Sequence, residues 1–153
     1  MITEGSIEIE APASVVWDVF TDVEHWSEWT ASIERIVALD GAEIEVGKRF
    51  EIKQPRMPKL VWEVTEVEPG VSWTWRQKAL GSTAFATHEV TAIDGERTVV
   101  RQKIDQRGPL GVPVGVLTRR MTRRYLDLEA QGLRERSLQS QSEGTFPADA
   151  ASA

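Results

Sequence analysis

Residues 71–104 read VSWTWRQKALGSTAFATHEVTAIDGERTVVRQKI, and this stretch decides the fold. Three runs rich in β-branched and aromatic residues, 71–78, 83–93 and 97–104, are separated only by short turn sequences, ALGS and DGE. Connections this short leave no room for crossover helices, so the strands should pair antiparallel. Asp94-Gly95 in particular suits a two-residue hairpin loop. The stretch therefore predicts three successive strands of an antiparallel meander.

The same pattern of strands and turns extends toward the N-terminus. Strand-like runs at 49–53 and 60–67 are followed by the turn-forming sequences QPRMPK and EPG. Residues 32–39 alternate with one irregularity, which is typical of a bulged strand. Residues 6–11, SIEIEA, alternate apolar and acidic side chains and predict a half-buried first strand. The sequence thus predicts seven strands.

Two short helices are predicted between the first two strands. Ser14 is a favourable N-cap residue, and apolar side chains follow it at helical spacing, which predicts a helix over 14–21. Asp22 can cap a second, shorter helical turn that carries His25, Trp26 and Trp29. The two tryptophans are one turn apart and can share a face, either packed in the core or lining a cavity.

A long amphipathic helix is predicted to close the fold. Residues 114–138 place apolar side chains on one side at helical spacing, and most arginines elsewhere. Residues 138–153 are poor in apolar side chains and lack periodicity, so we expect a disordered tail after a single domain at 1–137. The predicted apolar side consists of Val114, Leu117, Met121, Tyr125 and Leu128.

Composition narrows the class of protein. The chain has 153 residues, 41% of them hydrophobic, which is enough for one domain with a real core. No cysteine is present, which fits a reducing compartment, and we expect a cytoplasmic protein. No segment reaches the roughly 18 apolar residues of a membrane span. A net charge of -6 argues against nucleic-acid binding by the domain as a whole.

Several kinds of chemistry lack their sequence signatures here. No P-loop, GxGxxG, GxSxG or HExxH motif is found. With two histidines far apart in the sequence and no cysteine, a zinc site is not expected. We therefore expect no metal and no cofactor. The expected binding partner is a small hydrophobic molecule, and the expected oligomeric state is a monomer or a homodimer.

Three segments together resemble the START/SRPBCC superfamily. They are IEAPASVVWDVFTDVEHWSEW at 9–29, WEVTEVEPGVSWTW at 62–75, and ATHEVTAIDGERTVVRQKIDQRGPLG at 86–111. The resemblance covers roughly residues 2 to 137. The superfamily's fold is shared by the birch-pollen allergens and the bacterial polyketide cyclase/dehydrase group. It implies an α+β helix-grip fold, in which a seven-stranded curved antiparallel sheet wraps around the long C-terminal helix.

The resemblance also implies a deep apolar cavity between the sheet and the last helix. Across the superfamily this cavity holds lipids, hormones or polyketide-like molecules, and in a minority of members it supports cyclisation, dehydration or hydrolysis. Aromatic side chains are the natural walls of such a site, and the chain has six tryptophans. Trp73 and Trp75 share one face of their strand, and Trp17 on the first helix is expected in the core. The candidate ligand-binding residues are Trp26, Trp29, Phe50, Met57, Trp62, Trp73, Trp75, Phe85, His88, Met121 and Tyr125.

His25, Arg76 and His88 are the candidate polar contacts. His88 shares a strand face with Ala84, Ala86 and Val90, which could leave room for a ligand, so it is the candidate catalytic residue. His25 would lie at the cavity mouth, and Arg76 would turn inward only through a bulge. The alternative for each histidine is a surface or hydrogen-bonded structural role. A carboxylate trapped in the cavity could also act as an acid or base, but the sequence does not identify one.

The arginine-rich sequence TRRMTRR at 118–124 has two interpretations. Nearby Asp127, Glu129 and Glu135 favour a solvated helix face with local ion pairs. The other interpretation is a surface that binds a partner. The sequence thus supports three hypotheses: a binder of a small hydrophobic or aromatic, lipid-like or polyketide-like molecule; a cyclase or dehydratase in which His88 or a carboxylate moves a proton; and a partner-binding protein.

Overall fold

The computed structural model describes residues 1–145 of the chain. Residues 146–153, the second half of the predicted disordered tail at 138–153, lie outside the described residues. In chain order the elements are β1 (Ile2–Ile9), α1 (Ala13–Thr21), the 3-10 helix η1 (Val23–Glu28), β2 (Arg35–Ala38), β3 (Arg49–Lys53), β4 (Leu60–Glu68), β5 (Ser72–Ala79), β6 (Ser82–Ala92), β7 (Thr98–Arg107) and α2 (Gly111–Thr145).

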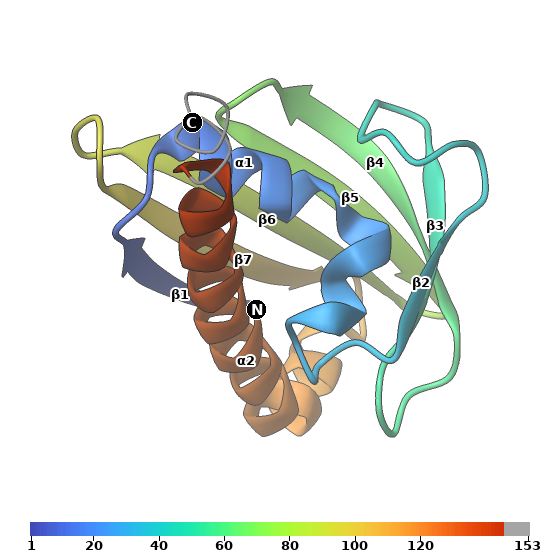
Figure 1. The fold of residues 1–153 in the computed structure, drawn as a ribbon. Coiled ribbons are helices and arrows are strands. Elements are labelled where there is room, and N and C mark those ends of the chain that lie inside the picture. Colours follow the sequence, from blue (N-terminus) through green and yellow to red (C-terminus); the bar gives the residue numbers. More distant parts are fainter. Residues whose placement is uncertain (146–153) are drawn as a thin grey trace, which may run out of the picture.

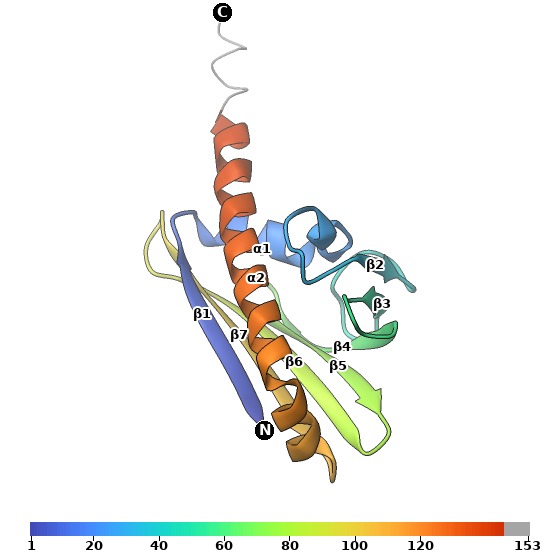
Figure 2. The same ribbon diagram turned by 90° about the horizontal axis from the view of Figure 1, so that it is seen from below.

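The strands form one seven-stranded antiparallel sheet in the order β1-β7-β6-β5-β4-β3-β2. The meander predicted from residues 71–104 is β5, β6 and β7. A register shift between Val64 and Glu66 interrupts the β4–β5 ladder, and such a bulge bends a sheet. The sheet curls, and α2 lies along its concave side (Figures 1 and 2). The predicted helix-grip architecture is confirmed.

The concave face of the sheet carries the core. On β6 the buried residues alternate with half-buried ones, and the inward row is Ala84, Ala86, His88 and Val90. An alternation with period two is what a sheet with one covered face requires. The neighbouring β5 contributes the buried rings of Trp73 and Trp75 to the same face.

Helices α1 and η1 cover the far end of the concave face. The rings of Phe20 on α1 and Trp26 on η1 stack at 5.6 Å, and the indole N–H of Trp26 donates to the Phe20 carbonyl at 2.9 Å. The hydrogen bond satisfies a polar group that would be costly to bury alone. Trp26 is thereby fixed against the sheet, where its ring lies 5.8 Å from that of Trp75.

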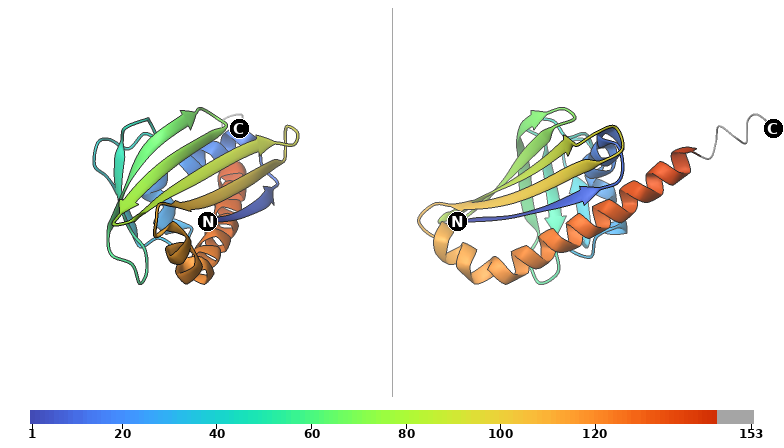
Figure 3. Two further views of the ribbon diagram at one scale, coloured as in Figure 1. Left: turned by 180° about the vertical axis from the view of Figure 1, so that it is seen from behind. Right: turned by 90° about the vertical axis from the view of Figure 1, so that its left-hand side faces the viewer.

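Helix α2 differs from its prediction in length and in rotation. It continues to Thr145, past the predicted domain end at 137, so residues 138–145 lie in the helix. Leu117 is 87% exposed, whereas Leu126 and Leu133 are buried. The predicted inner side, which includes Leu117 and Leu128 beside Met121, is wrong at Leu117, because the inward row runs from Met121 through Tyr125 and Leu126 to Leu133. Figure 3 shows the end of α2 projecting beyond the sheet.

A glycine allows the closest approach between α2 and the η1 region. A Cβ atom added to Gly132 would lie 1.9 Å from the Trp29 carbonyl oxygen and 2.9 Å from an atom of its ring. No side chain fits there, so Gly132 sets the distance between the two elements. The helices described by the structure, within residues 1–145, include none that is long and apolar enough to cross a membrane.

Candidate functional site

A cavity of about 280 Å³ lies between the concave face of the sheet and α2. This volume is close to the lower end of the range for small-molecule sites, about 300 Å³. Its walls come from η1, from every strand between β3 and β7, and from α2. The lining residues are Trp26, Ile33, Ile52, Gln54, Met57, Leu60, Trp62, Trp75, Gln77, Ala79, Leu80, Ser82, Ala84, Ala86, Thr87, His88, Gln102, Lys103, Ile104, Gln106, Val114, Thr118, Met121, Thr122, Tyr125, Leu126 and Glu129.

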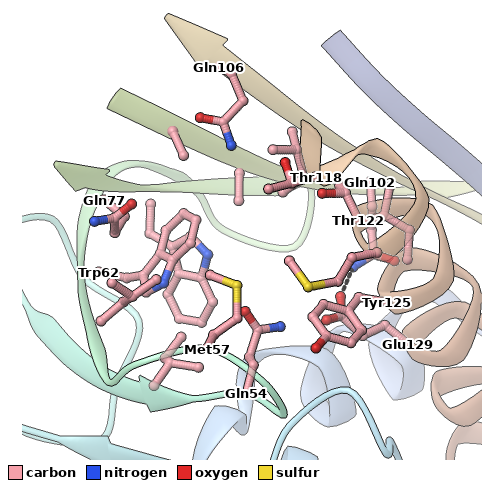
Figure 4. A pocket seen from close by; sticks show the side chains of 18 of the residues that line it. Gln54, Met57, Trp62, Gln77, Gln102, Gln106, Thr118, Thr122, Tyr125 and Glu129 are labelled. Carbon is pink, nitrogen blue, oxygen red and sulfur yellow. Dashed lines mark hydrogen bonds between the residues drawn. The ribbon is translucent and has the colours of Figure 1, made fainter. Parts of the chain in front are cut away.

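Small side chains on β6 leave the space open. Ala84 and Ala86 point inward in the middle of the sheet, where larger side chains would reach toward α2. The facing part of α2 presents Thr118, Met121 and Tyr125 at spacings of three and four residues, which places them on one side of a helix. Figure 4 shows Trp62 and Met57 on one side of the cavity and Tyr125 on the other.

The mouth of the cavity is formed by the β5–β6 turn, the start of α2 and the loop between β3 and β4. Leu80 in the β5–β6 turn is 97% exposed, although it also lines the cavity. The Tyr125 hydroxyl donates to the Pro55 carbonyl at 2.5 Å, and this bond ties the β3–β4 loop to α2. Met57 of the same loop lines the cavity, as a flexible side chain at a mouth would.

The inner end of the cavity is polar and centred on Glu129. Glu129 on α2 is 8% exposed. The Gln102 side chain donates from Nε2 to Glu129 Oε2 at 2.7 Å, and the Ser32 hydroxyl donates to Oε1 at 2.9 Å. The Ser32 hydroxyl lies in turn 2.9 Å from Thr30 Oγ1. Two separate parts of the chain, β7 and the segment after η1, therefore hold the buried carboxyl group of α2 in place.

Burial changes the acidity of this group. It raises the pKa of the Glu129 carboxyl to about 7, and the hydrogen bonds from Gln102 and Ser32 oppose that rise by stabilising the ionised form. Glu129 therefore exchanges its proton near neutral pH, as a general acid or base must. The prediction that Glu129 forms local pairs on a solvated helix face is wrong. Glu129 follows Tyr125 by four residues and Met121 by eight, and this helical spacing is the signal that places it inward.

His88 lies beside Gln102 and is enclosed by aromatic rings. It is 3% exposed, and its ring stacks on Trp73 at 3.7 Å with an interplanar angle of 12°. Nδ1 lies 3.3 Å from the Trp73 carbonyl oxygen. Burial lowers the pKa of His88 to about 3, and the backbone hydrogen bond opposes that fall only in part. The ring is consequently neutral at pH 7. It can take part in a hydrogen bond, but it is not protonated and cannot act as a general acid at this pH.

Seven of the candidate ligand-binding residues line the cavity and four do not. Trp29, Phe50 and Trp73 belong to the packed core, and Phe85 points to the convex face. The Arg107 guanidinium lies 4.5 Å from the centroid of the Phe85 ring on that outer face. Strand alternation explains why Phe85 points outward: it lies between Ala84 and Ala86, which both point inward, and successive side chains of a strand point to opposite faces. The seven lining residues are Trp26, Met57, Trp62, Trp75, His88, Met121 and Tyr125.

Arg76 and His25 lie away from the cavity. Arg76 Nη2 is 2.8 Å from Glu63 Oε1 across the β4–β5 pair, and the bulge in that pair does not turn Arg76 inward. The His25 ring is largely exposed, with Nδ1 2.8 Å from an Asp22 carboxylate oxygen. The hydrogen bond and the charge of Asp22 raise the pKa of His25. Both residues make surface pairs.

The arginine-rich part of α2 does not form the local pairs predicted for it. Within residues 1–145, no ion pair or hydrogen bond to a side chain involves Arg119, Arg120, Arg123 or Arg124, and all four are exposed. They follow the exposed Val116 and Leu117 on the outer side of the helix. Within the same residues, no three acidic or histidine side chains gather in a way that could hold a metal ion.

The fold and its cavity define the helix-grip class of START/SRPBCC proteins. A sequence pattern described as polyketide cyclase/dehydrase and lipid transport matches residues 2–137. The chain belongs to that family. A comparison with curated proteins gives no match.

Solved structures of several relatives share the fold. A norcoclaurine synthase point mutant from Thalictrum flavum, in complex with a transition state analogue, aligns with a TM-score of 0.71 at 12% identity over 92% of this chain and 96% of that one. A START superfamily protein from Mycobacterium smegmatis gives 0.72 at 16% identity over 90% and 97%. The Zhui aromatase/cyclase from Streptomyces sp. R1128 gives 0.67 at 16% identity over 97% of both chains. At such low identity these likenesses establish the fold.

Proposed function

We propose that the protein binds one small hydrophobic or aromatic molecule, lipid-like or polyketide-like, in the cavity between the sheet and α2. The observation that carries this proposal is an interior left open by alanines and walled by Trp26, Trp62 and Trp75. Burying apolar surface against such walls yields about 25 cal/mol per Å², so an apolar guest gains affinity without any specific contact. The family description, which includes lipid transport, supports the same proposal.

Tryptophan fluorescence tests the binding. Three lining tryptophans will report a guest, so titration with aromatic alcohols, flavonoids and fatty alcohols should give a saturating shift for at least one class. Ala86→Phe places a ring in the cavity and should abolish the response, whereas Ala92→Phe, on an exposed position of the same strand, should retain it. A flat response across the panel, or an unchanged one in Ala86→Phe, would contradict the proposal.

Glu129 favours a second candidate function, proton-transfer catalysis of the cyclase or dehydratase type. A buried carboxyl whose pKa is about 7 can remove a proton next to a carbonyl and return it to a leaving hydroxyl, releasing water. His88 is too weak a base for the same role, because its pKa is about 3. The catalytic candidate therefore moves from His88 to Glu129.

A β-hydroxy aryl ketone tests the catalytic candidate, because loss of water gives a conjugated enone that absorbs in the near ultraviolet. Turnover above buffer should vanish in Glu129→Gln and persist in Glu135→Gln, an exposed position on the same helix. Equal rates in wild type and Glu129→Gln would remove Glu129 from any mechanism.

A third candidate is a partner that binds the outer face of α2. It rests on the four exposed arginines, which lack ion-pair partners among the described residues. Replacing all four by glutamine should release a co-purifying macromolecule, and a preparation at low salt without any co-purifying macromolecule would contradict this function.

For the binding and the catalytic function alike we propose the cytoplasm as the location, since the chain has no cysteine.

A further inference from the structure

The inner end of the cavity has a carboxyl group and no opposing cation. Of the described residues that line the cavity, Lys103 is the only lysine or arginine. Lys103 directly follows Gln102 on β7, so its side chain points to the other face of the sheet. Facing Glu129 are Gln102 from β7 and Ser32 from the segment after η1, both uncharged. His88 of β6 pairs with Gln102 in register and is neutral at pH 7.

The Glu129 carboxyl group has acceptor capacity to spare. An ionised carboxylate can accept about four hydrogen bonds, and within residues 1–145 Glu129 accepts one on each oxygen. The group also lines the cavity, so a guest can reach it. Because the carboxyl group is anchored by two donors, it does not have to reorganise when a third arrives.

The rings around this end suit the body of the same ligand. The centroids of Trp26 and Trp75 lie 5.8 Å apart, and both indoles line the cavity next to His88. Indole faces attract apolar and aromatic groups, and they also attract cations. A guest with an aromatic body and a donor at one end would therefore be matched along its whole length.

We propose that the inner end of the cavity selects a ligand whose head group donates a hydrogen bond to Glu129, an amine or a hydroxyl on an aromatic or otherwise apolar body, and rejects a carboxylate head. This inference rests on the proposed binding function and names its ligand class. An anionic head would bring a second negative charge to a buried carboxylate, and no lysine or arginine among the described residues faces Glu129 to offset it.

Three probes with one shared body test the selection. They are 2-(1-naphthyl)ethylamine, 2-(1-naphthyl)ethanol and 1-naphthylacetate, measured by isothermal titration calorimetry on the full chain at pH 8, where Glu129 is ionised because its pKa is about 7. The amine and the alcohol should bind, and the acetate should bind about tenfold more weakly or worse, the cost of losing a hydrogen bond to a charged group. This comparison needs no variant.

The variant Glu129→Gln adds a second, independent result. It keeps the shape of the side chain and removes the charge, so the affinity for the amine should fall about tenfold while the affinity for the acetate rises. Glu135→Gln, exposed on the same helix, should reproduce the wild-type order. The inference is overturned if the acetate binds as tightly as the alcohol in wild type, or if Glu129→Gln keeps the wild-type preference. If none of the three probes binds, the binding function itself fails and the head-group selection fails with it.

Discussion

The two ends of the cavity are built in opposite ways. At the inner end, Glu129 and His88 are buried; Glu129 accepts hydrogen bonds from β7 and from the segment after η1, and His88 is hydrogen-bonded to a carbonyl of β5. At the mouth, Leu80 is exposed, and among the described residues one side-chain hydrogen bond, from Tyr125 to Pro55, ties α2 to the β3–β4 loop. From this difference we expect the inner end to be the more rigid one, and under the proposed binding function we expect the mouth to be the part that changes shape.

The difference between the two ends predicts where substitutions should affect both stability and ligand choice. Buried ionisable groups cost free energy of folding, and a protein keeps them where function requires them. Changes at the inner end should therefore alter stability and ligand choice strongly, and changes at the mouth should alter mainly the rate of ligand exchange.

The largest effect is expected from Glu129→Gln at high pH. Since the folded-state pKa of Glu129 is about 7 and its ordinary value is 4.5, the folded protein holds this proton more tightly than the unfolded chain, and stability is lost as the pH rises from 4.5 to 7. Glutamine carries no charge, so the variant should be more stable than wild type by about 3 kcal/mol at pH 8. Urea unfolding at pH 8 and at pH 4.5 checks this, and the gain should disappear at the lower pH.

A change of similar size is expected from Gly132→Ala. The added Cβ would overlap the Trp29 carbonyl, so α2 and η1 must separate, at a cost of about 2–3 kcal/mol. Gly115→Ala near the mouth is the matched control, because the three atoms nearest to its new Cβ all belong to the Met1 side chain and none to the backbone. Thermal unfolding should show a large loss for the first variant and a small change for the second. Equal losses would mean that the inner end is no more tightly packed than the mouth.

His88→Gln should change how stability depends on pH. The folded-state pKa of His88 is about 3 and its ordinary value is 6.5, so the unfolded chain takes up this proton first, and wild type loses stability as the pH falls below 6.5. The stability of wild type relative to the variant should therefore fall by about 2 kcal/mol between pH 7 and pH 5. Urea titrations of both proteins at the two pH values measure this. A pH-independent difference would show that the ring is not buried in its neutral form.

The smallest effect on stability is expected at the mouth. Tyr125→Phe removes only the hydroxyl that donates to Pro55 and should cost about 1 kcal/mol. Freed from α2, the β3–β4 loop should admit and release ligand several times faster, with little change in affinity. Stopped-flow tryptophan fluorescence separates the two rates. Unchanged rates would show that this loop does not form the entrance.

The sequence was sufficient for the fold because the strand signals are local. Alternation and turn residues in 71–104 identify β5, β6 and β7, and short connections force antiparallel pairing. The same alternation puts Phe85 on the face opposite to Ala84 and Ala86, so the outward position of Phe85 is also encoded in the local sequence.

The polar inner end was harder to predict because it depends on contacts between distant segments. Ser32, Gln102 and Glu129 are each unremarkable residues in their local sequence, and only the packing of α2 against β7 and the segment after η1 brings them together. The rotation of α2 was ambiguous for the same reason, since leucines occur on both sides of that helix. Trp29, Phe50 and Trp73 have the right parity or position for a cavity wall, but neighbouring rings cover them.

Native mass spectrometry of the full chain with 2-(1-naphthyl)ethanol tests most directly whether the space between the sheet and α2 accepts a guest. We predict one bound molecule per chain in wild type and in Ala92→Phe, and none in Ala86→Phe. A wild-type spectrum free of adduct at saturating alcohol, or an equal adduct in Ala86→Phe, would contradict the account.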